Sequence, residues 1–282
     1  MIILDLSQVM LSNIMVQLGN HTNAEIEEGM VRHMVLNSIR SYKTKFGAEY
    51  GELVIACDNK NYWRRQLFPY YKANRKKNQE ASEINWKAIF ECLNKIRAEL
   101  KEVFPYRVID IESAEADDII GTLCRAYGDT GEKILILSGD KDFIQLQRYI
   151  NVRQFDPVRK KFINHNDPEK FLFEHILKGD AGDGIPNVLS NDNCMVVGER
   201  QRPLTQKKID SLASIATSFD HPVFRNYKRN EQLIDLTKIP VNISEQILES
   251  YKNQEGKKPN GLMDYFIANR LKNLMENVGE FV

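Results

Sequence analysis

The stretch that decides the fold is Lys133-Ile-Leu-Ile-Leu-Ser-Gly-Asp-Lys-Asp-Phe143. Its apolar run, from Ile134 to Leu137, is typical of a strand that is buried on both faces of a parallel sheet. Asp140 and Asp142 follow a Ser-Gly break, at the carboxyl end where open α/β sheets usually place their chemistry. This pair is consistent either with an exposed, capped turn or with carboxylates that hold a divalent metal ion.

Other acidic residues in the chain favour the metal-binding alternative, because they also occur at the ends of apolar runs. Apolar runs at 1–6, 52–58 and 106–111 predict three more strands, and further acids occur in a helix that begins near Ala114 and in a glycine-rich turn at 179–187. Such a cluster would repel itself strongly without metal, and two Mg²⁺ or Mn²⁺ ions about 3.5–4 Å apart, clamping a phosphodiester, would explain it. The candidate metal ligands are Asp5, Asp58, Glu115, Asp117, Asp118, Asp140, Asp142, Asp180 and Asp183.

The helix that begins near Ala114 leaves the choice between neighbouring acids open. Ideal geometry puts Glu115 and Asp118, which are three residues apart, on one face and turns Asp117 elsewhere. Because the first residues of a helix need not be helical, Asp117 also remains a candidate ligand.

Length and composition limit the class of protein. At 282 residues, the chain suits one large domain or two small ones. Its 39 basic and 39 acidic residues balance, so net charge alone predicts neither nucleic-acid nor membrane binding. The 4 cysteines and 5 histidines are scattered and indicate neither a zinc site nor a disulfide framework. With no apolar run of membrane-spanning length and no signal peptide, the sequence indicates a cytoplasmic protein.

The segment 59–79 combines positive charge with aromatic rings. It holds seven basic residues, five aromatic residues and no acid. Basic groups attract phosphates, and aromatic faces stack on unpaired bases with about 1–3 kcal/mol for each base. A solvated loop is the alternative, but loops exposed to water seldom carry so many aromatic residues, so we expect contact with nucleic acid.

The rest of the pattern is mainly helical. We expect helices over 22–50, 81–104 and 168–177, short strands at 150–155 and 161–163, and an all-helical stretch over 203–282. The basic segment and the second helix form an insertion, about 59–104, that should stand above the sheet as a lid or arch. An excess of positive charge between Glu199 and Arg229 favours binding of a duplex backbone over a merely solvated face.

Three acidic motifs, in this order, resemble those of the 5′-nuclease (flap endonuclease) superfamily: Ser113-Ala-Glu-Ala-Asp-Asp118, Ser138-Gly-Asp-Lys-Asp-Phe143 and Gly179-Asp-x-x-Asp-Gly-Ile-Pro186. Arg64 and the run Tyr71-Lys-Ala-Asn-Arg75 are similar to the arch of bacterial members. The C-terminal stretch, with Gly198-Glu-Arg200, is closest to the T-even phage branch, of the ribonuclease H type, and like that branch it lacks the second glycine turn of most members. The resemblance covers essentially the whole chain.

The resemblance implies a fold and a division of the chain. The expected fold class is α/β, with a central, mostly parallel sheet flanked by helices, a helical arch insertion and an all-helical C-terminal DNA-binding region. The expected domains are a metal-dependent nuclease core over 1–178 and a helical duplex-binding region over 179–282.

The resemblance also implies roles for individual residues. One metal site matches Asp5, Asp58, Glu115, Asp117 and Asp140, and the second matches Asp142, Asp180 and Asp183. Lys72 and Arg64 would face the scissile phosphate as catalytic residues. The expected nucleic-acid contacts are Arg65, Tyr71, Arg75, Lys76, Lys77, Arg200, Arg202, Lys207 and Lys208.

The implied function is that of a Mg²⁺-dependent 5′→3′ exonuclease and flap endonuclease, with Mn²⁺ able to substitute, that removes RNA primers and 5′ DNA flaps in phage DNA replication. Its substrates would be branched or nicked duplex DNA and RNA:DNA hybrids. The phage resemblance further implies a monomer in the host bacterial cytoplasm, with a single-stranded-DNA-binding protein and a sliding clamp as partners. The alternatives are a metal-dependent phosphatase, which needs no basic arch, and a structural binder of branched DNA whose metal site has decayed.

Overall fold

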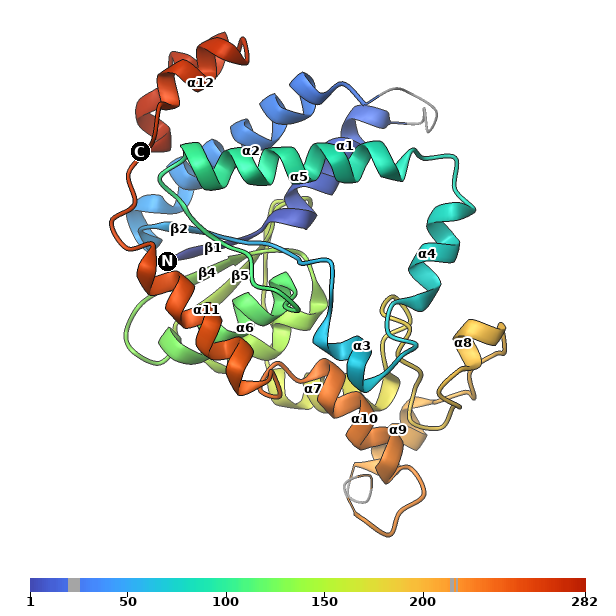
Figure 1. The fold of residues 1–282 in the computed structure, drawn as a ribbon. Helices are drawn as coiled ribbons and strands as arrows, with labels where there is room; N and C mark the ends of the chain where they lie inside the picture. The colour runs from blue at the N-terminus through green and yellow to red at the C-terminus, as the bar shows by residue number, and fades with distance from the viewer. Residues whose placement is uncertain (20–25, 214–215, 217) are drawn as a thin grey trace.

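The computed structural model describes residues 1–19, 26–213, 216 and 218–282 (Figure 1). At its centre lies a six-stranded sheet in the order β3-β2-β1-β4-β5-β6, in which β6 pairs antiparallel with β5 and the other pairings are parallel. The strands are β1 (Ile2–Asp5), β2 (Leu53–Ala56), β3 (Arg107–Ile109), β4 (Ile134–Leu137), β5 (Val152–Asp156) and β6 (Lys161–Ile163). The predicted mostly parallel α/β sheet is thereby confirmed.

The central strands are apolar on both sides because helices cover both faces of the sheet. On β1, for example, Ile2 and Leu4 belong to one core and Ile3 belongs to the other. The first core lies under α1 (Leu6–Leu18), α2 (Glu28–Tyr50) and α5 (Trp86–Val103). The second lies under α6 (Ala116–Tyr127) and α11 (Val241–Asn253), on the opposite face in Figure 1. Unbroken apolar runs in the sequence therefore reflect burial on two sides.

The predicted helix over 22–50 is confirmed from Glu28 to Tyr50, but the sequence reasoning missed a helix before it. The sequence predicts one helix over 22–50, but α1 begins directly after β1 and α2 begins only at Glu28. Asp5 caps α1 by accepting a hydrogen bond from the Gln8 backbone amide at 3.2 Å. Apolar residues occur on several sides of α1, so no helical stripe marks it in the sequence. The first part of the predicted span, 22–25, lies outside the described residues.

The insertion 59–104 is helical, as expected, but only part of it lies above the edge of the sheet. It contains α3 (Trp63–Leu67), α4 (Ala73–Glu80) and α5. Figure 1 shows α4 joining the lower helical region of the molecule to the layer that contains α5. Because α5 buries Ile89, Ile96 and Leu100 in the first core, it is a layer of the α/β fold and not part of an arch. We therefore call residues 59–85 the arch segment.

The C-terminal region serves both the sheet and a third core. A separate apolar cluster is enclosed by the arch segment together with α7 (Pro168–Lys178), α9 (Gln206–Leu212) and α10 (Phe224–Ile234). Farther along, α11 covers one face of the sheet, while α12 (Leu262–Ala268) and α13 (Lys272–Met275) pack on the other. Short helices complete the chain: η1 (Lys141–Arg148), α8 (Cys194–Val197) and η2 (Val278–Phe281). The region is helical as predicted, and the boundary at 178/179 stays a prediction, since both sheet cores include residues from both sides of it.

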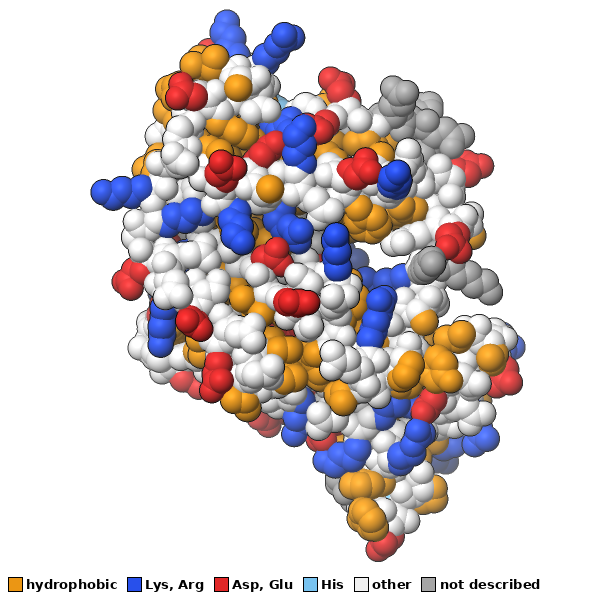
Figure 2. Space-filling model, in the orientation of Figure 1, with side chains coloured by type: hydrophobic (Ala, Val, Ile, Leu, Met, Phe, Trp, Pro, Cys, Tyr) orange, Lys and Arg blue, Asp and Glu red, His pale blue; other side chains and the backbone are white. Residues whose placement is uncertain are grey.

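The surface carries local patches of charge. Acidic and basic side chains are interspersed over the face drawn in Figure 2, in keeping with the balanced net charge. In the lower part of this view, where α9 and α10 lie, lysine and arginine side chains gather. Within the described ranges, the structure contains no helix with the length and apolar character needed to span a membrane.

Candidate active site

A cavity of about 130 Å³ opens at the carboxyl ends of β1, β2 and β4. The strand order reverses between β1 and β4, which is the position at which open α/β sheets bind ligands. The cavity brings together five of the nine candidate metal ligands from distant parts of the chain. Its charged lining residues are Asp5, Asp58, Asp117, Asp140 and Asp183, with Lys72 and Arg75.

Local hydrogen bonds place these acids. Asp5, the last residue of β1, accepts a hydrogen bond from the Ser138 hydroxyl at 3.1 Å. Asp58 follows β2 and accepts the backbone amide of Ala116 at 2.9 Å, which ties the start of α6 to the cavity. Asp140 follows β4 and caps η1. Each carboxylate is thus held by a strand end or by a helix start.

Burial and mutual repulsion raise the pKa of several of these carboxyl groups. Burial, followed by the negative charge of Asp58, raises the pKa of Asp5 to about 7. Burial, followed by the charge of Asp140, raises the pKa of Asp117 well above its usual range. The pKa of Asp140 is itself raised by burial and by the charge of Asp183. A cation among these groups would relieve the repulsion, and oxygen donors of this kind suit Mg²⁺, so the residues fit a divalent metal site.

The raised pKa of Asp5 predicts how the stability of the metal-free protein depends on pH. Its folded value, about 7, lies above the value of 3.8 expected for the unfolded chain, so the folded state binds the proton more tightly. The metal-free protein should therefore lose stability as the pH rises from about 4 to about 7. Added Mg²⁺ should raise the midpoint of thermal unfolding more at pH 8 than at pH 5, because protons compete with the ion. Calorimetry at the two pH values measures this difference, and equal shifts would contradict it.

Glu115 and Asp118 are buried outside the lining of the cavity. Arg64 pairs with Glu115 Oε2 at 2.9 Å and with Asp118 Oδ1 at 2.8 Å. Asp118 also completes a capping box with Glu115 at the start of α6. This geometry leaves Asp117 as the acid that faces the cavity, whereas helix phase alone favoured Asp118. Asp118 is therefore placed as a capping and ion-pair residue, which does not fit the expected role of metal ligand.

Arg64 is only 2% exposed, which does not fit the direct phosphate contact expected of it. Besides its two carboxylate partners, its Nε donates a hydrogen bond to the Leu233 carbonyl at 2.8 Å. Burial lowers the pKa of this guanidinium, but the charge of Asp118 and neighbouring groups more than compensates and raises the pKa above its usual value. In this structure Arg64 joins the arch segment, α6 and α10 beneath the site.

Lys72 lies in the wall between the acidic cavity and a larger cavity of about 690 Å³. Its ammonium group pairs with Glu115 and lies 3.6 Å from Asp183 Oδ2. Its backbone has a left-handed φ of 54°, and its amide donates to the Asp183 carbonyl at 2.7 Å. The larger cavity is bounded by residues of α1, the arch segment and α5. The cation predicted to be catalytic thus lies at the border of both spaces.

The sequence predicts that the aromatic residues of the arch segment are accessible to nucleic acid, but most of them are buried. Trp63, Phe68 and Tyr71 are 5%, 3% and 1% exposed, and the last two belong to the third core. Burial excludes base stacking on these three rings, so a stacking contact of Tyr71 does not fit this structure. Tyr62 and Tyr70 are half-buried. Most of these rings instead anchor the base of the arch segment on the C-terminal helices.

Most of the basic residues expected to contact nucleic acid are exposed. Arg65 and Arg75 line the larger cavity, and Arg75 also pairs with Asp183 at 2.5 Å. The side chains of Lys76 and Lys77 lie outside the described part of the chain. The exposed basic residues on α9 and just before it are Arg200, Arg202, Lys207 and Lys208.

Asp142 and Asp180 gather around His175, to which no motif in the sequence pointed. The ring Nε2 lies 3.3 Å from Asp180 Oδ2, and Nδ1 lies 3.6 Å from Asp142 Oδ1. Lys141 also reaches Asp180 Oδ2, at 2.9 Å. His175 and Asp180 lie close together along the chain, on either side of the end of α7. This proximity is a local signal that could have identified His175 from the sequence. Asp183, expected beside this pair, donates its backbone amide to Asp180 Oδ1 at 3.2 Å and also lines the first cavity.

Comparison with known proteins identifies the family of the two halves of the chain. A family model described as "5'-3' exonuclease, N-terminal resolvase-like domain" matches residues 5–174. A second, described as "T4 RNase H, C terminal", matches residues 167–281. The matches together cover residues 5–281, which include most of the sheet, the arch segment and the C-terminal helices.

Individual relatives agree with these matches. The chain is 34% identical to ribonuclease H of Enterobacteria phage T4, over 99% of this chain and 95% of that protein. It is 33% identical to a 5'-3' exonuclease of Buchnera aphidicola subsp. Acyrthosiphon pisum, over 48% of this chain and 47% of that protein. Its fold is similar to that of a bacteriophage T5 flap endonuclease, solved as a pseudo-enzyme–product complex with DNA and metal ions, with a TM-score of 0.63 and 17% identity over 90% of this chain and 98% of that one. The chain therefore belongs to the 5′-3′ exonuclease family, with a C-terminal region of the T4 RNase H type, and is a hydrolase of the 5′-nuclease class.

Proposed function

We propose that this chain is a Mg²⁺-dependent 5′→3′ exonuclease and flap endonuclease that hydrolyses phosphodiesters of RNA primers and 5′ DNA flaps in phage DNA replication. The observation that carries the proposal is the acidic cavity, in which carboxylates from five separate segments converge beside two cations. The carboxylates can bind divalent metal ions, and the two cations can bind the phosphate groups of a nucleic acid. The cavity therefore contains both kinds of group needed to bind and cleave a phosphodiester.

The lining residues divide into two groups. The first group would hold two divalent ions, either Mg²⁺ or Mn²⁺. It consists of the carboxylates of Asp5, Asp58, Asp117, Asp140 and Asp183. When bound, such ions supply Lewis acidity towards water and the phosphodiester and neutralise negative charge.

The cationic group is centred on Lys72. Its ammonium lies at the border of the acidic cavity, where it would approach the phosphate oxygens and offset the charge that develops in the transition state. Glu115 and Asp183 hold that ammonium in place before substrate arrives. Lys72 thus needs little reorganisation to act.

The larger cavity offers a path to this site for a single strand. It is lined by basic groups that include Lys60, Arg65 and Arg97, and by the rings of Trp86 and Phe90 from α5. Phe90 is exposed, and the two rings lie 6.0 Å apart between centroids. We propose that these α5 rings, and not the buried rings of the arch segment, stack on unpaired bases.

We propose that α9 binds the duplex backbone, and the dependence of binding on salt tests this role. Replacing Lys207 and Lys208 by Ala should make the plot of log binding constant against log salt shallower, by about 0.9 for each lost phosphate contact. Cleavage of bound substrate at saturation should not change. Replacing Lys252 and Lys272, which are exposed on α11 and α13, is the matched control. An unchanged slope in the first variant would remove α9 from the duplex site.

Cleavage of a labelled 5′-flap duplex with and without Mg²⁺ tests the proposed function. We expect cleavage only with the ion, and no turnover of small phosphomonoesters. Rapid turnover of a small phosphomonoester would favour a phosphatase. Tight binding of the flap without cleavage in Mg²⁺ or Mn²⁺ would favour a structural binder of branched DNA.

We propose branched or nicked duplex DNA and RNA:DNA hybrids as substrates. The likeness to phage T4 ribonuclease H supports this choice, as does the DNA complex of the T5 flap endonuclease. We further propose that the protein acts as a monomer in the host bacterial cytoplasm, with a single-stranded-DNA-binding protein and a sliding clamp as partners.

A further inference from the structure

One carboxylate, that of Asp192, is bound by two arginines of α10. Arg225 donates from Nη1 to Asp192 Oδ1 at 2.9 Å and from Nη2 to Oδ2, so the two planar groups meet through a pair of hydrogen bonds. Arg229 also donates from its Nη1 to Asp192 Oδ1. A guanidinium group binds a carboxylate and a phosphate with the same two-pronged geometry. A phosphate group can therefore take the place of Asp192 opposite Arg225.

The two arginines differ in how firmly the structure holds them. The side chain of Arg229 is 9% exposed, and its Nη2 also donates to the Pro186 carbonyl at 2.9 Å. The side chain of Arg225 is 73% exposed. An exposed side chain can change partners, whereas a buried guanidinium that leaves its acceptors loses hydrogen bonds that water does not replace. Arg225 is therefore the arginine that can turn towards a ligand in solvent.

The departure of Arg225 from Asp192 leaves no buried charge unpaired. The Asp192 side chain is 25% exposed and keeps Arg229 as its partner. The ion pair that breaks is exposed, and water screens such pairs, so breaking it costs little. Asn226 independently fixes the segment that carries Asp192, because its Nδ2 donates to the Val188 carbonyl at 2.9 Å. One anion can therefore replace the other at Arg225 while this segment stays in place.

The surroundings of Arg225 indicate the source of such a phosphate. Lysine and arginine side chains gather in the lower part of Figure 2, where α9 and α10 lie. These two helices pack together in the third core, and α9 carries the proposed duplex contacts Lys207 and Lys208. A duplex presents phosphates at regular intervals along its backbone. A duplex backbone that lies on α9 and extends over α10 thus supplies a phosphate for Arg225.

We propose that Arg225 binds a backbone phosphate of duplex DNA and that Asp192 occupies this phosphate site when no DNA is bound. Asp192 is thus an internal competitor: the duplex must displace it from Arg225, which lowers the affinity of the protein for DNA. Arg229 remains paired with Asp192 throughout. The inference rests on the duplex binding that the proposed function assigns to the C-terminal helices, and it is measured as binding, without cleavage.

A double-mutant cycle in the full-length protein tests this competition. Binding of a blunt DNA duplex is measured at low salt, without divalent ions, for the wild type, Asp192→Asn, Arg225→Ala and the double variant. Asn keeps an oxygen for Arg229 but lacks the charge that holds Arg225. We expect Asp192→Asn to bind about fivefold more tightly than the wild type, and Arg225→Ala about fivefold more weakly. In the Arg225→Ala background, the change at Asp192 should alter the affinity by less than about twofold.

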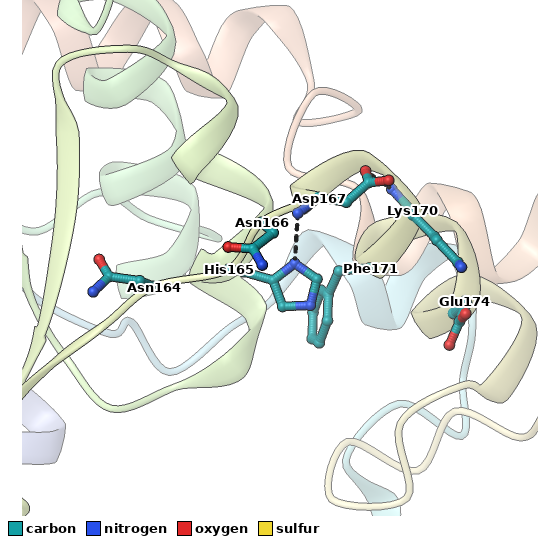
Figure 3. A pocket seen from close by; sticks show the side chains of 7 residues that line it. All are labelled: Asn164, His165, Asn166, Asp167, Lys170, Phe171 and Glu174. Atoms are coloured by element: carbon teal, nitrogen blue, oxygen red, sulfur yellow. Dashed lines mark hydrogen bonds between the residues drawn. The ribbon is translucent and has the colours of Figure 1, made fainter.

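Two further variants control for a general effect of charge. Glu231→Gln removes a negative charge from the same helix, where Glu231 pairs with Lys228 at 2.7 Å. Lys170→Ala removes an exposed positive charge from the start of α7, where Lys170 lines a cavity of about 500 Å³ (Figure 3). Both should bind the duplex with an affinity within about twofold of the wild type. Thermal unfolding shows whether each variant is folded at the assay temperature.

Three results overturn the proposal. Unchanged or weaker binding by folded Asp192→Asn would mean that Asp192 only orients Arg225. An equal gain in both backgrounds would come from charge at long range and not from Arg225. Unchanged affinity in Arg225→Ala overturns the proposal whether or not the Asp192 variant folds. The expected cycle in a protein that cleaves no flap with Mg²⁺ would support this inference while overturning the proposed function.

Discussion

Replacing Asp140 by Asn is expected to lower the rate of cleavage by about 10³-fold or more, while DNA binding stays intact or becomes tighter. Asp140 lines the acidic cavity, and its Oδ1 accepts the Asp142 amide at 3.0 Å. Asn keeps this capping oxygen but removes the charge, so the fold is retained while the metal-binding set loses a carboxylate. Loss of the charge also weakens repulsion of the incoming phosphate.

Single-turnover cleavage and gel shifts with one flap substrate separate these two effects of the Asp140 change. Asp110→Asn is the matched control, because Asp110 also follows a strand but pairs with Arg97 at 3.6 Å and lies outside the cavity lining. It should cleave at close to the wild-type rate. If Asp140→Asn lost binding in parallel with activity, the role assigned to Asp140 would be wrong.

The change Lys72→Ala is expected to lower the single-turnover rate by about 10²-fold or more at saturating enzyme. A lysine that only guides the strand contributes equally to the ground state and the transition state, so its loss raises KM and spares the chemical step. For Lys76→Ala and Lys77→Ala we expect a raised KM and an unchanged single-turnover rate, because these lysines are predicted only to guide the strand. Rates for the single variants on one flap substrate distinguish the two roles.

The ion pairs of Lys72 call for a stability control. Its loss leaves the buried Glu115 without that partner, which typically costs about 3–5 kcal/mol, so thermal unfolding must show that the variant is folded at the assay temperature. Arg75→Ala is the comparison, because Arg75 also pairs with Asp183 at the cavity but is exposed. It should change KM more than the rate. An unchanged rate for folded Lys72→Ala would reduce the arch segment to a binding surface.

The sheet and the meeting of acids at its edge could be predicted because their signals are local. An apolar run followed by an acid marks the carboxyl end of a buried strand, and Asp5, Asp58 and Asp140 all follow that pattern. Long-range pairing of buried polar groups leaves no such mark. Arg64, for example, donates to the Leu233 carbonyl, 169 residues away, and nothing in its neighbours shows this burial.

Composition also failed to show which way the rings of the arch segment point. Aromatic residues among basic ones suit nucleic acid, but they suit a core equally well when another helix covers them. Phe68 and Tyr71 are covered by α7, α9 and α10, which follow far later in the chain, so no local pattern could assign them to the third core.

The third core has a consequence for recombination between relatives. A fragment that stopped at Lys178 would expose Phe68 and Tyr71 and remove the carbonyl that binds Arg64. Chimeras that exchange the C-terminal helices must therefore exchange the arch segment with them, because the two inherit one packing surface. The segments that can be exchanged as a unit are therefore those that pack together in the structure, and they are not contiguous in the sequence.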